Sequence, residues 1–322
     1  MVKRVLFVGL GSIGLRHLNN LKGLLPSAEF AALRSKKTNV KSYDLVDYEF
    51  HDISEATQFK PDLVFITNPT TKHIETALKF INNTSGIFIE KPISDNLKSA
   101  LYLTKIADLS KEVVHVSCPL RFHPSLKFLK NHIQNLDENI VNINIFSGSY
   151  LPSWRPETDY KDCYSSKKEL GGGVSLDLIH ELDYLRWIFG DIAQGYFGSD
   201  KVSDLDLDVE DLAYSIMKLE SGARCELHLD YFRKISKREI EICTSKNNFI
   251  NVDLINSIVK ICEDGNEDVF EMTFDRNQMY VDELKYFLKC VMNHEKSFNN
   301  AFFATETLKY ALYMRNNVGV VK

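Results

Sequence analysis

The chain has 322 residues, enough for two domains of ordinary size, and its 44% of hydrophobic residues is typical of a globular protein with a buried core. Its net charge of −5 argues against a nucleic-acid partner or an anionic membrane surface. No apolar run reaches the roughly 18 residues of a membrane span, and the six cysteines have no metal-binding spacing, so we expect a cytoplasmic protein with reduced thiols, small-molecule partners and no bound metal.

The chain begins with an apolar run of strand type that leads directly into a glycine-rich turn and a helix. In the spacing G-x-G-x-x-G, the first glycine allows a tight turn, the second lets a ligand approach the backbone, and the third lets the helix pack on its strand. The N–H groups at the start of a helix also attract a pyrophosphate. We therefore predict a dinucleotide site at Gly9, Gly11, Ser12, Ile13 and Gly14.

Short apolar runs alternate with helical patterns along the first 120 residues. The candidate strands are residues 5–8, 30–33, 63–67, 87–89 and 113–117, and the candidate helices are residues 13–24, 71–82 and 96–109. This alternation is typical of βαβ units and a parallel sheet. It predicts a doubly wound Rossmann domain over residues 1–120.

The residues after the second candidate strand indicate the type of dinucleotide. An NAD site would have an acidic residue there to accept hydrogen bonds from the ribose, but the sequence reads Leu33-Arg34-Ser35-Lys36-Lys37. Arg34 and Ser35 can bind a 2′-phosphate, with Lys36 or Lys37 adding charge. The alternative is an exposed basic loop. We expect NADP(H) to be favoured over NAD(H).

The residues after the strand at 63–67 lie where parallel strands line a cofactor crevice. Thr67, Asn68 and Pro69 are therefore predicted cofactor contacts. His73 in the next helix and His17 in the first helix are interpreted as ordinary polar helix residues.

Glu90 and Lys91 follow the strand at 87–89, again at the edge of the sheet where ligands bind. An ammonium group there can donate to a substrate oxygen and stabilise the alkoxide that develops as hydride leaves the same carbon. The alternative is an exposed ion pair at the end of a strand. We predict that Lys91 is catalytic and contacts substrate, and that both residues contact the cofactor.

A glycine run at residues 171–173 precedes a predicted helix. Asp177, His180 and Tyr184, spaced by three and four residues, would share one face of it. Histidine exchanges protons near neutral pH, and a neighbouring carboxylate can orient it. Acids that complement a helix dipole would explain Asp177 but not His180. We predict that all three residues bind substrate and that Asp177 and His180 are catalytic.

Two further segments offer candidate substrate contacts. Trp154 and Arg155 supply a stacking plane and a fork for an anion, although an aromatic loop can also simply pack between domains. We predict that both contact cofactor and substrate. Arg121 and His123, at the start of the second domain, are also predicted substrate contacts, with Arg121 meeting a carboxylate or phosphate.

Apolar and polar residues alternate with strand periodicity from residue 140 onward, in residues 141–146, 213–219, 224–231, 239–244, 249–253 and 258–262. These runs favour an antiparallel sheet with one face on helices, in an α+β domain. Amphipathic helices at residues 280–292 and 301–314 are expected to complete this second domain, residues 121–322.

The chain resembles the glucose-fructose oxidoreductase/inositol dehydrogenase/MocA family of NAD(P)-dependent oxidoreductases over nearly its whole length. The resemblance rests on GLGSIGLRHLNNL near the start, EKPIS at 90–94, LRFHP at 120–124 and GGGVSLDLIHELDYLRWIFG at 171–190. It implies a Rossmann domain followed by a domain with a large, open, mostly antiparallel sheet, an active site between them, and a homodimer or homotetramer formed through that sheet.

The resemblance also implies roles for individual residues. Lys91 would be the substrate-contacting lysine, and Asp177 and His180 the aspartate and histidine of the site. Many members space the last two residues by four positions rather than three, so the general base stays unassigned. In one branch of the family a loop like that at residues 150–161 closes over the nicotinamide and substrate.

We therefore expect an oxidoreductase that transfers hydride between a nicotinamide cofactor and a secondary alcohol or ketone of a sugar or sugar derivative, such as a nucleotide-linked amino sugar or a nonulosonic acid. One alternative is a redox-neutral enzyme with a tightly bound dinucleotide, for glycoside cleavage or epimerisation. Another is a dinucleotide-sensing regulatory protein, against which the presence of both Lys91 and His180 argues.

Overall fold

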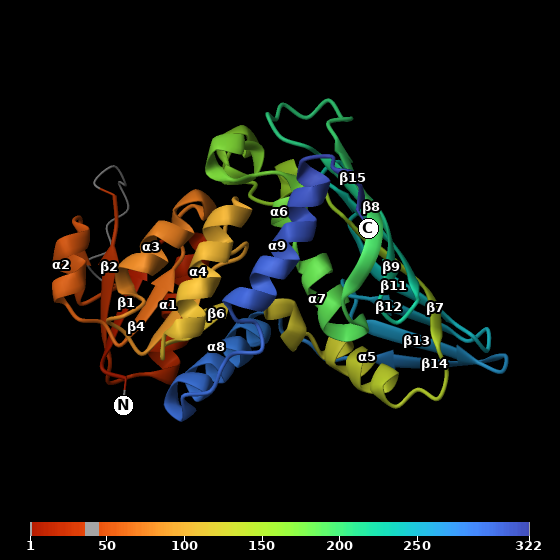
Figure 1. The fold of residues 1–322 in the computed structure, drawn as a ribbon, viewed down its shortest axis with the longest axis horizontal. Helices are drawn as coiled ribbons and strands as arrows, with labels where there is room; N and C mark the ends of the chain where they lie inside the picture. Colours follow the sequence, from red (N-terminus) through yellow and green to blue (C-terminus); the bar gives the residue numbers. More distant parts are fainter. Residues whose placement is uncertain (1, 36–44, 322) are drawn as a thin grey trace. The chain divides into compact units, whose positions relative to one another are not determined.

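The protein, as a computed structural model that describes residues 2–35 and 45–321, divides into two units (Figure 1). The first unit contains the chain up to Pro119 together with Asn277–Leu308. The second contains Leu120–Arg276 and the chain from Lys309 onward.

A parallel sheet forms the centre of the first unit. In the described part of the chain it has six strands in the order β3-β2-β1-β4-β5-β6, with every neighbouring pair parallel. The strands are β1 (Arg4–Val8), β2 (Glu29–Leu33), β3 (Tyr48–Phe50), β4 (Leu63–Ile66), β5 (Gly86–Ile89) and β6 (Val113–Val116). The central strands β4 and β5 are buried along their whole length, as continuous apolar runs predict. The predicted Rossmann sheet is confirmed; β3 was not predicted because three residues give no periodic signal.

Helices alternate with these strands as predicted. They are α1 (Ser12–Leu24), α2 (Ile53–Gln58), α3 (His73–Phe80) and α4 (Leu97–Leu109), with a 3₁₀ turn at Thr70–Lys72 before α3. Asn96 sets the start of α4, since its side chain accepts the Ser99 N–H at 3.0 Å. The short α2 was not predicted.

Of the last two helices, α8 (Arg276–Asn293) lies in the first unit from Asn277 onward, whereas α9 (Ala301–Arg315) is divided between the units after Leu308. The prediction that both complete the second domain is therefore wrong for α8. Phe287 of α8 packs edge-on in the core of the first sheet, with ring centroids 5.8 Å from Phe65 and 5.5 Å from Phe88. An amphipathic pattern indicates that a helix has a buried face but not which core it covers.

The second unit contains a mostly antiparallel sheet. Its described strands number nine, in the order β14-β13-β12-β11-β7-β10-β9-β8-β15, and only β7 and β10 pair in parallel. They are β7 (Ile140–Gly148), β8 (Ile192–Asp200), β9 (Leu212–Leu219), β10 (Arg224–Asp230), β11 (Lys237–Thr244), β12 (Phe249–Asp253), β13 (Ile258–Glu263), β14 (Asn266–Glu271) and β15 (Gly319–Val321). The predicted sheet type is confirmed. Three strands were not predicted: β8 contains two glycines, β14 is mostly polar and β15 is short.

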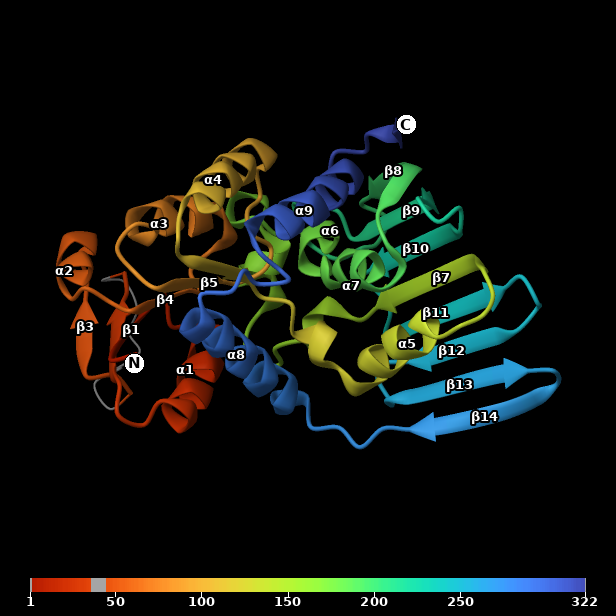
Figure 2. The ribbon, with the colours of Figure 1, turned by 60° about the horizontal axis from the view of Figure 1, so that its bottom comes forward.

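Helices cover one face of this sheet. Figure 2 shows α5 (Pro124–Gln134), α6 (Val174–Asp177) and α7 (His180–Phe189) on that face. Along β9, alternate residues are buried while the others are partly or fully exposed, as one covered face requires. The 3₁₀ turns of this unit are Pro119–Phe122, Leu151–Ser153, Tyr160–Asp162, Tyr164–Ser166 and Lys168–Leu170. Across the described ranges, no helix has the length and apolar character that a membrane crossing requires.

Candidate active site

The glycine turn between β1 and α1 is shaped by its protein neighbours at two of its three glycines. Gly9 has a φ of +92°, and a Cβ atom there would lie 2.9 Å from the Asn68 nitrogen. At Gly14 it would lie 2.7 Å from Thr67 Oγ1. At Gly11 it would meet no atom of the described residues within 4 Å, and the start of α1 beside it is exposed. This open space and the N–H groups of the first helical turn fit a pyrophosphate.

The loop after β4 contains the next predicted cofactor contacts. Thr67 Oγ1 donates to the Gly9 carbonyl at 2.7 Å, so its hydroxyl stabilises the glycine turn. Asn68 Nδ2 donates to Thr76 Oγ1 at 2.9 Å, whereas the buried Asn68 Oδ1 has no hydrogen-bond partner among the described residues. A buried acceptor without a donor is costly, so Asn68 fits a ligand that brings an N–H group. Pro69 is exposed at the start of the following 3₁₀ turn.

Glu90 and Lys91 follow β5, at the same carboxyl edge of the sheet. Glu90 Oε1 lies 2.6 Å from His17 Nε2, and Glu90 Oε2 accepts the Lys91 backbone N–H at 3.2 Å. Burial alone would raise the pKa of Glu90, but the hydrogen bond and charge from His17 and the charge of Lys91 hold it below its usual value. The buried carboxylate is therefore ionised, and it fixes the backbone of the half-buried Lys91.

Arg34, the basis of the cofactor prediction, forms an ion pair within the first unit. Its Nη1 lies 3.5 Å from Glu49 Oε2, and its side chain is 5% exposed. No acid follows β2 in the sequence, but β3 pairs with β2 and brings Glu49 beside Arg34. The guanidinium thus already has a counter-charge. Ser35 is exposed, and Lys36 and Lys37 lie outside the described residues.

Asp177, at the end of α6, is 3% exposed and is held by two phenols. The Tyr164 hydroxyl donates to its Oδ1, and the Tyr231 hydroxyl donates to its Oδ2 at 2.6 Å. Burial first, and then the charge of Asp177, raise the pKa of both phenols well above the usual value, so both keep their protons. Each carboxylate oxygen thus accepts a hydrogen bond from a tyrosine.

The continuous helix predicted to carry Asp177, His180 and Tyr184 is broken. α6 ends at Asp177 and α7 begins at His180, and Leu178 between them has a non-helical ψ of 30°. Tyrosines from two other segments hold Asp177, so tertiary contacts contribute to its position. His180 is half-buried.

Tyr184 lies inside the second unit. Its side chain is 0% exposed, and its hydroxyl has no hydrogen-bond partner among the residues that the structure describes. This burial argues against the predicted contact with substrate.

Arg121 and His123 are engaged inside the second unit. Arg121 donates twice to the carboxylate of Asp183, at 2.8 and 2.7 Å, so the carboxylate that it meets belongs to α7 rather than to a substrate. His123 caps α5, with its Nδ1 accepting the Ser125 N–H at 3.2 Å. Burial, together with the charge of Arg238, lowers the pKa of His123 to about 4. Arg121 thus has a structural partner, as does His123 at Nδ1, and these partners argue against the predicted contacts with substrate.

Trp154 and Arg155 pack on the two tyrosines that hold Asp177. Trp154 Nε1 donates to Ser149 Oγ at 2.8 Å, and its ring meets that of Tyr231 edge-on at 5.3 Å. The Arg155 guanidinium carbon lies 5.6 Å from the centre of the Tyr164 ring. The predicted loop is thus connected to the predicted catalytic aspartate within one unit.

Two protein-family models match successive parts of the chain. Residues 3–118 match the oxidoreductase family with an NAD-binding Rossmann fold, and residues 138–250 match the GFO/IDH/MocA C-terminal domain. The chain belongs to the Gfo/Idh/MocA family of oxidoreductases. This confirms the resemblance seen in the sequence, and this family member is an oxidoreductase with an NAD(P)-binding Rossmann domain.

Relatives of this Gfo/Idh/MocA protein include two inositol dehydrogenases. It is 26% identical over 200 residues to inositol 2-dehydrogenase/D-chiro-inositol 3-dehydrogenase of Lacticaseibacillus casei, an alignment that covers 59% of this chain and 54% of that protein. It is 23% identical over 310 residues to myo-inositol 2-dehydrogenase of Thermotoga maritima, covering 91% and 89%. Among solved structures, UDP-N-acetylglucosamine 3-dehydrogenase from Acidithiobacillus ferrooxidans has a TM-score of 0.80 at 19% identity, covering 98% of both chains, which shows a shared fold.

Both types of nicotinamide cofactor occur among the relatives. Two scyllo-inositol 2-dehydrogenases of Bacillus subtilis match: an NADP⁺ form, 29% identical over 104 residues, which cover 32% of this chain and 30% of that protein, and an NAD⁺ form, 23% identical over 334 residues, which cover 98% and 93%. Membership of the family therefore establishes a nicotinamide dinucleotide without selecting NADP(H) or NAD(H).

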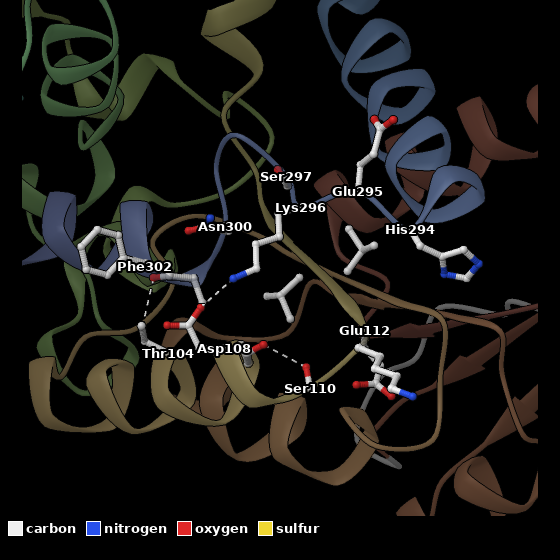
Figure 3. A pocket seen from close by; sticks show the side chains of 15 residues that line it. Thr104, Asp108, Ser110, Glu112, His294, Glu295, Lys296, Ser297, Asn300 and Phe302 are labelled. Atoms are coloured by element: carbon white, nitrogen blue, oxygen red, sulfur yellow. Dashed lines mark hydrogen bonds and ion pairs between the residues drawn. The ribbon is translucent and has the colours of Figure 1, made fainter.

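A cavity of about 350 Å³ in the first unit of this family member contains none of the predicted site residues (Figure 3). It lies beside the end of α4, the start of β6 and the segment between α8 and α9. Lys296 Nζ and Asp108 Oδ1 form an ion pair of 3.1 Å at its wall. Exposed ion pairs of this kind contribute little to stability. Since none of the predicted site residues lines the cavity, we give it no role in the reaction.

The sequence analysis missed several residues that pair with predicted site residues, among them Glu49, Tyr164, Asp183 and Tyr231, and it noted His17 only as a polar helix residue. The partners are 73 positions apart for His17, 62 for Asp183 and 54 for Tyr231, but only 13 for Tyr164. Such pairings leave no periodic signal in a single sequence.

Proposed function

We propose that this protein is an NAD(P)-dependent dehydrogenase or reductase that acts on a secondary alcohol or ketone of a sugar or sugar derivative. One observation carries the proposal. The glycine turn, Asn68 and Lys91 follow β1, β4 and β5, three adjacent parallel strands, and so lie along one carboxyl edge. A dinucleotide cradle and a lysine at one edge are what hydride transfer to or from a polarised alcohol needs.

The residues of this edge fit a nicotinamide dinucleotide. The open space at Gly11 and the N-terminus of α1, at Ser12 and Ile13, would hold the pyrophosphate. Asn68, whose buried Oδ1 has no partner in the described part of the chain, would accept an N–H of the nicotinamide amide. When bound, the cofactor supplies or accepts the hydride.

Arg34 and Glu49 together would set the preference between the two cofactors. We expect NADP(H) to be preferred through contact of Arg34 with the 2′-phosphate, and that contact has to compete with Glu49 at 3.5 Å. The preference should therefore be moderate.

We assign separate roles to the three catalytic candidates. Lys91 would donate to the substrate oxygen and stabilise the alkoxide as hydride leaves the carbon. Asp177 has both oxygens occupied by Tyr164 and Tyr231, so it would act as a fixed negative charge. His180, the half-buried first residue of α7, would take the proton.

Two observations support a substrate class: the names of relatives and the loop that follows β7. Two relatives are named for inositols, and a structure with the same fold is named for a UDP-linked amino sugar. Trp154 and Arg155 offer an aromatic plane and a cation for an anionic sugar derivative. We propose a nucleotide-linked amino sugar or a nonulosonic acid within this class.

We also infer a homodimer or homotetramer that assembles through the open face of the nine-stranded sheet. Tyr196, Ile216 and Val320 pair across three adjacent strands and are 41%, 60% and 68% exposed. A row of exposed apolar side chains on a sheet favours burial against a second copy. Light scattering of the full-length protein measures the assembly.

The experiment that tests the function is nicotinamide absorbance with NADP(H) and NAD(H) in both directions, against free sugars, cyclitols, UDP-sugars and CMP-linked nonulosonic acids. We expect Lys91→Ala to lower turnover by about two or more orders of magnitude with cofactor affinity nearly unchanged. The matched control is Lys98→Ala, at an exposed lysine of α4, which should behave like the wild type.

Other outcomes would contradict the proposal. Equal activity in Lys91→Ala would remove the role of this lysine. Conversion of a substrate without net change in absorbance would indicate a redox-neutral enzyme. Binding of dinucleotide without conversion of any compound would favour a regulatory protein.

A further inference from the structure

We infer that His17 and His73 are positioning residues for Lys91, because each holds one of the two residues that flank Lys91 in the chain. The inference rests on the proposed role of Lys91. We refer to His17 with Glu90 and His73 with Pro92 as the histidine clamp.

His17 fixes the residue before Lys91. It lies on α1, is 0% exposed, and places Nε2 2.6 Å from Glu90 Oε1. The other oxygen of Glu90 accepts the Lys91 backbone N–H. The His17 ring also packs edge-on against Phe88, with centroids 5.0 Å apart. A buried, charge-assisted hydrogen bond of this length is among the stronger ones, so His17 restrains Lys91 through Glu90.

His73 fixes the residue after Lys91. It is the first residue of α3 and is 2% exposed. Its Nδ1 lies 2.9 Å from the Pro92 carbonyl oxygen, and its Nε2 lies 2.9 Å from the Asn68 carbonyl oxygen. A charged ring donates to both carbonyls, and a neutral ring to one at a time. The pKa of His73 lies below its usual value, because burial outweighs the opposite effects of the two carbonyls and of the charges of Glu90 and Asp95.

The strand order explains why two histidines meet this segment. β4 lies between β1 and β5, α1 follows β1, and α3 follows β4. His17 therefore links the helix of the glycine turn to the end of β5, and His73 links the loop after β4 to the loop after β5. The segment that carries Lys91 is therefore linked to the helix of the glycine turn and to the loop with Asn68, the two places where we propose that the dinucleotide binds.

A held backbone matters for the proposed reaction, because the Lys91 ammonium has to meet the substrate oxygen at hydrogen-bond distance. A displacement of about 1 Å can cost on the order of 100-fold in rate. Loss of either half of the clamp should therefore lower kcat more than it lowers binding of the cofactor.

The test compares His17→Leu, His17→Gln and His73→Phe with His115→Gln. His115 is a matched control, because it is also 0% exposed in the first unit and its Nε2 lies 3.1 Å from a buried glutamate, Glu283. The readouts are kcat, NADPH affinity by fluorescence, and the unfolding temperature. We expect the clamp variants to lose about 10-fold or more in kcat with the NADPH Kd within about threefold. His17→Gln, whose amide can still donate to Glu90, should lose less than His17→Leu.

Two results would overturn the inference. A loss of kcat in His115→Gln as large as that in His17→Leu would mean that any buried histidine of the unit has this effect. A loss in each variant that simply parallels its unfolding temperature would mean that the histidines only stabilise the fold. If His17→Leu does not fold, His17→Gln and His73→Phe carry the comparison.

A readout without substrate separates this inference from the proposed function. Competitive acetylation with acetic anhydride, followed by mass spectrometry, compares Lys91 with exposed Lys98. We expect clamp variants to change the Lys91 rate at least about twofold and to leave that of Lys98 unchanged. With this result, the histidine clamp is supported even if the wild type converts no compound of the panel. An unchanged acetylation rate of Lys91 in the clamp variants would overturn the inference, whatever the enzymatic activity.

Discussion

Asp177 illustrates, at the scale of the residue, how hydrogen bonds within the second unit hold a carboxylate in one position. Tyr164 comes from the 3₁₀ turns before it, Tyr231 follows β10, and both donate to it. Trp154 and Arg155 pack against these tyrosines. The sequence pattern predicted Asp177 and His180 as candidates, but the tyrosines that hold Asp177 leave no comparable signal, because only the folded chain brings them together.

Replacing either tyrosine by phenylalanine should test whether Asp177 is fixed by these bonds. Tyr164→Phe and Tyr231→Phe should each destabilise the fold by about 1.5–3 kcal/mol, the value of a hydrogen bond to a charged group, and should lower kcat. Tyr184→Phe is the control: its hydroxyl has no partner among the described residues, so its removal should leave stability equal or higher. Denaturant unfolding and steady-state kinetics measure both effects, and equal losses in all three variants would contradict the assignment.

His123 should make the fold less stable in acid. Its folded pKa of about 4 lies below the ordinary 6.5, owing to burial and then to the charge of Arg238. As the pH falls, the unfolded chain takes up the proton first, so this contribution is complete above pH 6.5 and declines between pH 6.5 and 4. His123→Asn keeps a good N-cap residue and removes the titrating ring.

Over that pH window, the wild type should lose up to about 3 kcal/mol more stability than His123→Asn. Urea unfolding at several pH values measures the difference. His294→Asn, at an exposed histidine, should follow the wild type. Parallel curves for the wild type and His123→Asn would show that His123 does not titrate in this way.

At the scale of the element, α8 shows how a helix can join a core that its neighbours in the sequence do not form. It packs on β5 at Gly86, where a Cβ atom would lie 2.6 Å from Val291 Cγ2 and 3.0 Å from Phe287 Cζ. The absence of a side chain at Gly86 is thus a condition for the close approach of α8. The periodicity of the sequence predicts the helix itself. Which core the helix packs on depends on the return of the chain to the first unit.

Gly86→Ala should therefore destabilise the protein by about 1–3 kcal/mol, because the added methyl group overpacks the contact between β5 and α8. Gly23→Ala is the matched control. Gly23 lies within α1, and a Cβ atom there would meet no described atom within 4 Å, so alanine should stabilise by up to about 1 kcal/mol. Thermal unfolding of both variants checks the opposite signs; a neutral Gly86→Ala would mean that α8 can move away.

At the scale of the whole molecule, the chain leaves the first unit at Pro119 and returns to it at Asn277. The returning segment supplies Leu284, Phe287 and Val291 to the core that contains Phe65 and Phe88. The first unit is therefore discontinuous in sequence. The domain boundary predicted near residue 120 describes one crossing of the chain and omits the return.

A fragment of residues 1–119 should fail to fold stably, because it exposes the apolar surface that α8 covers. The same fragment joined by a flexible linker to residues 277–308 should give a cooperative thermal transition. Near-ultraviolet circular dichroism and thermal melts compare the two. A cooperative transition in the short fragment alone would show that α8 is dispensable.

The sequence by itself determined the parallel sheet of the first unit, the mostly antiparallel sheet of the second, the family and the nicotinamide dinucleotide, because strand periodicity and the glycine turn are local properties of the chain. The tertiary structure decided the partners of the charged and polar side chains. It paired Arg34 with Glu49 and Arg121 with Asp183, and it broke the helix between Asp177 and His180. Those outcomes depend on which distant segments pack together, and no local pattern in the chain encodes that arrangement.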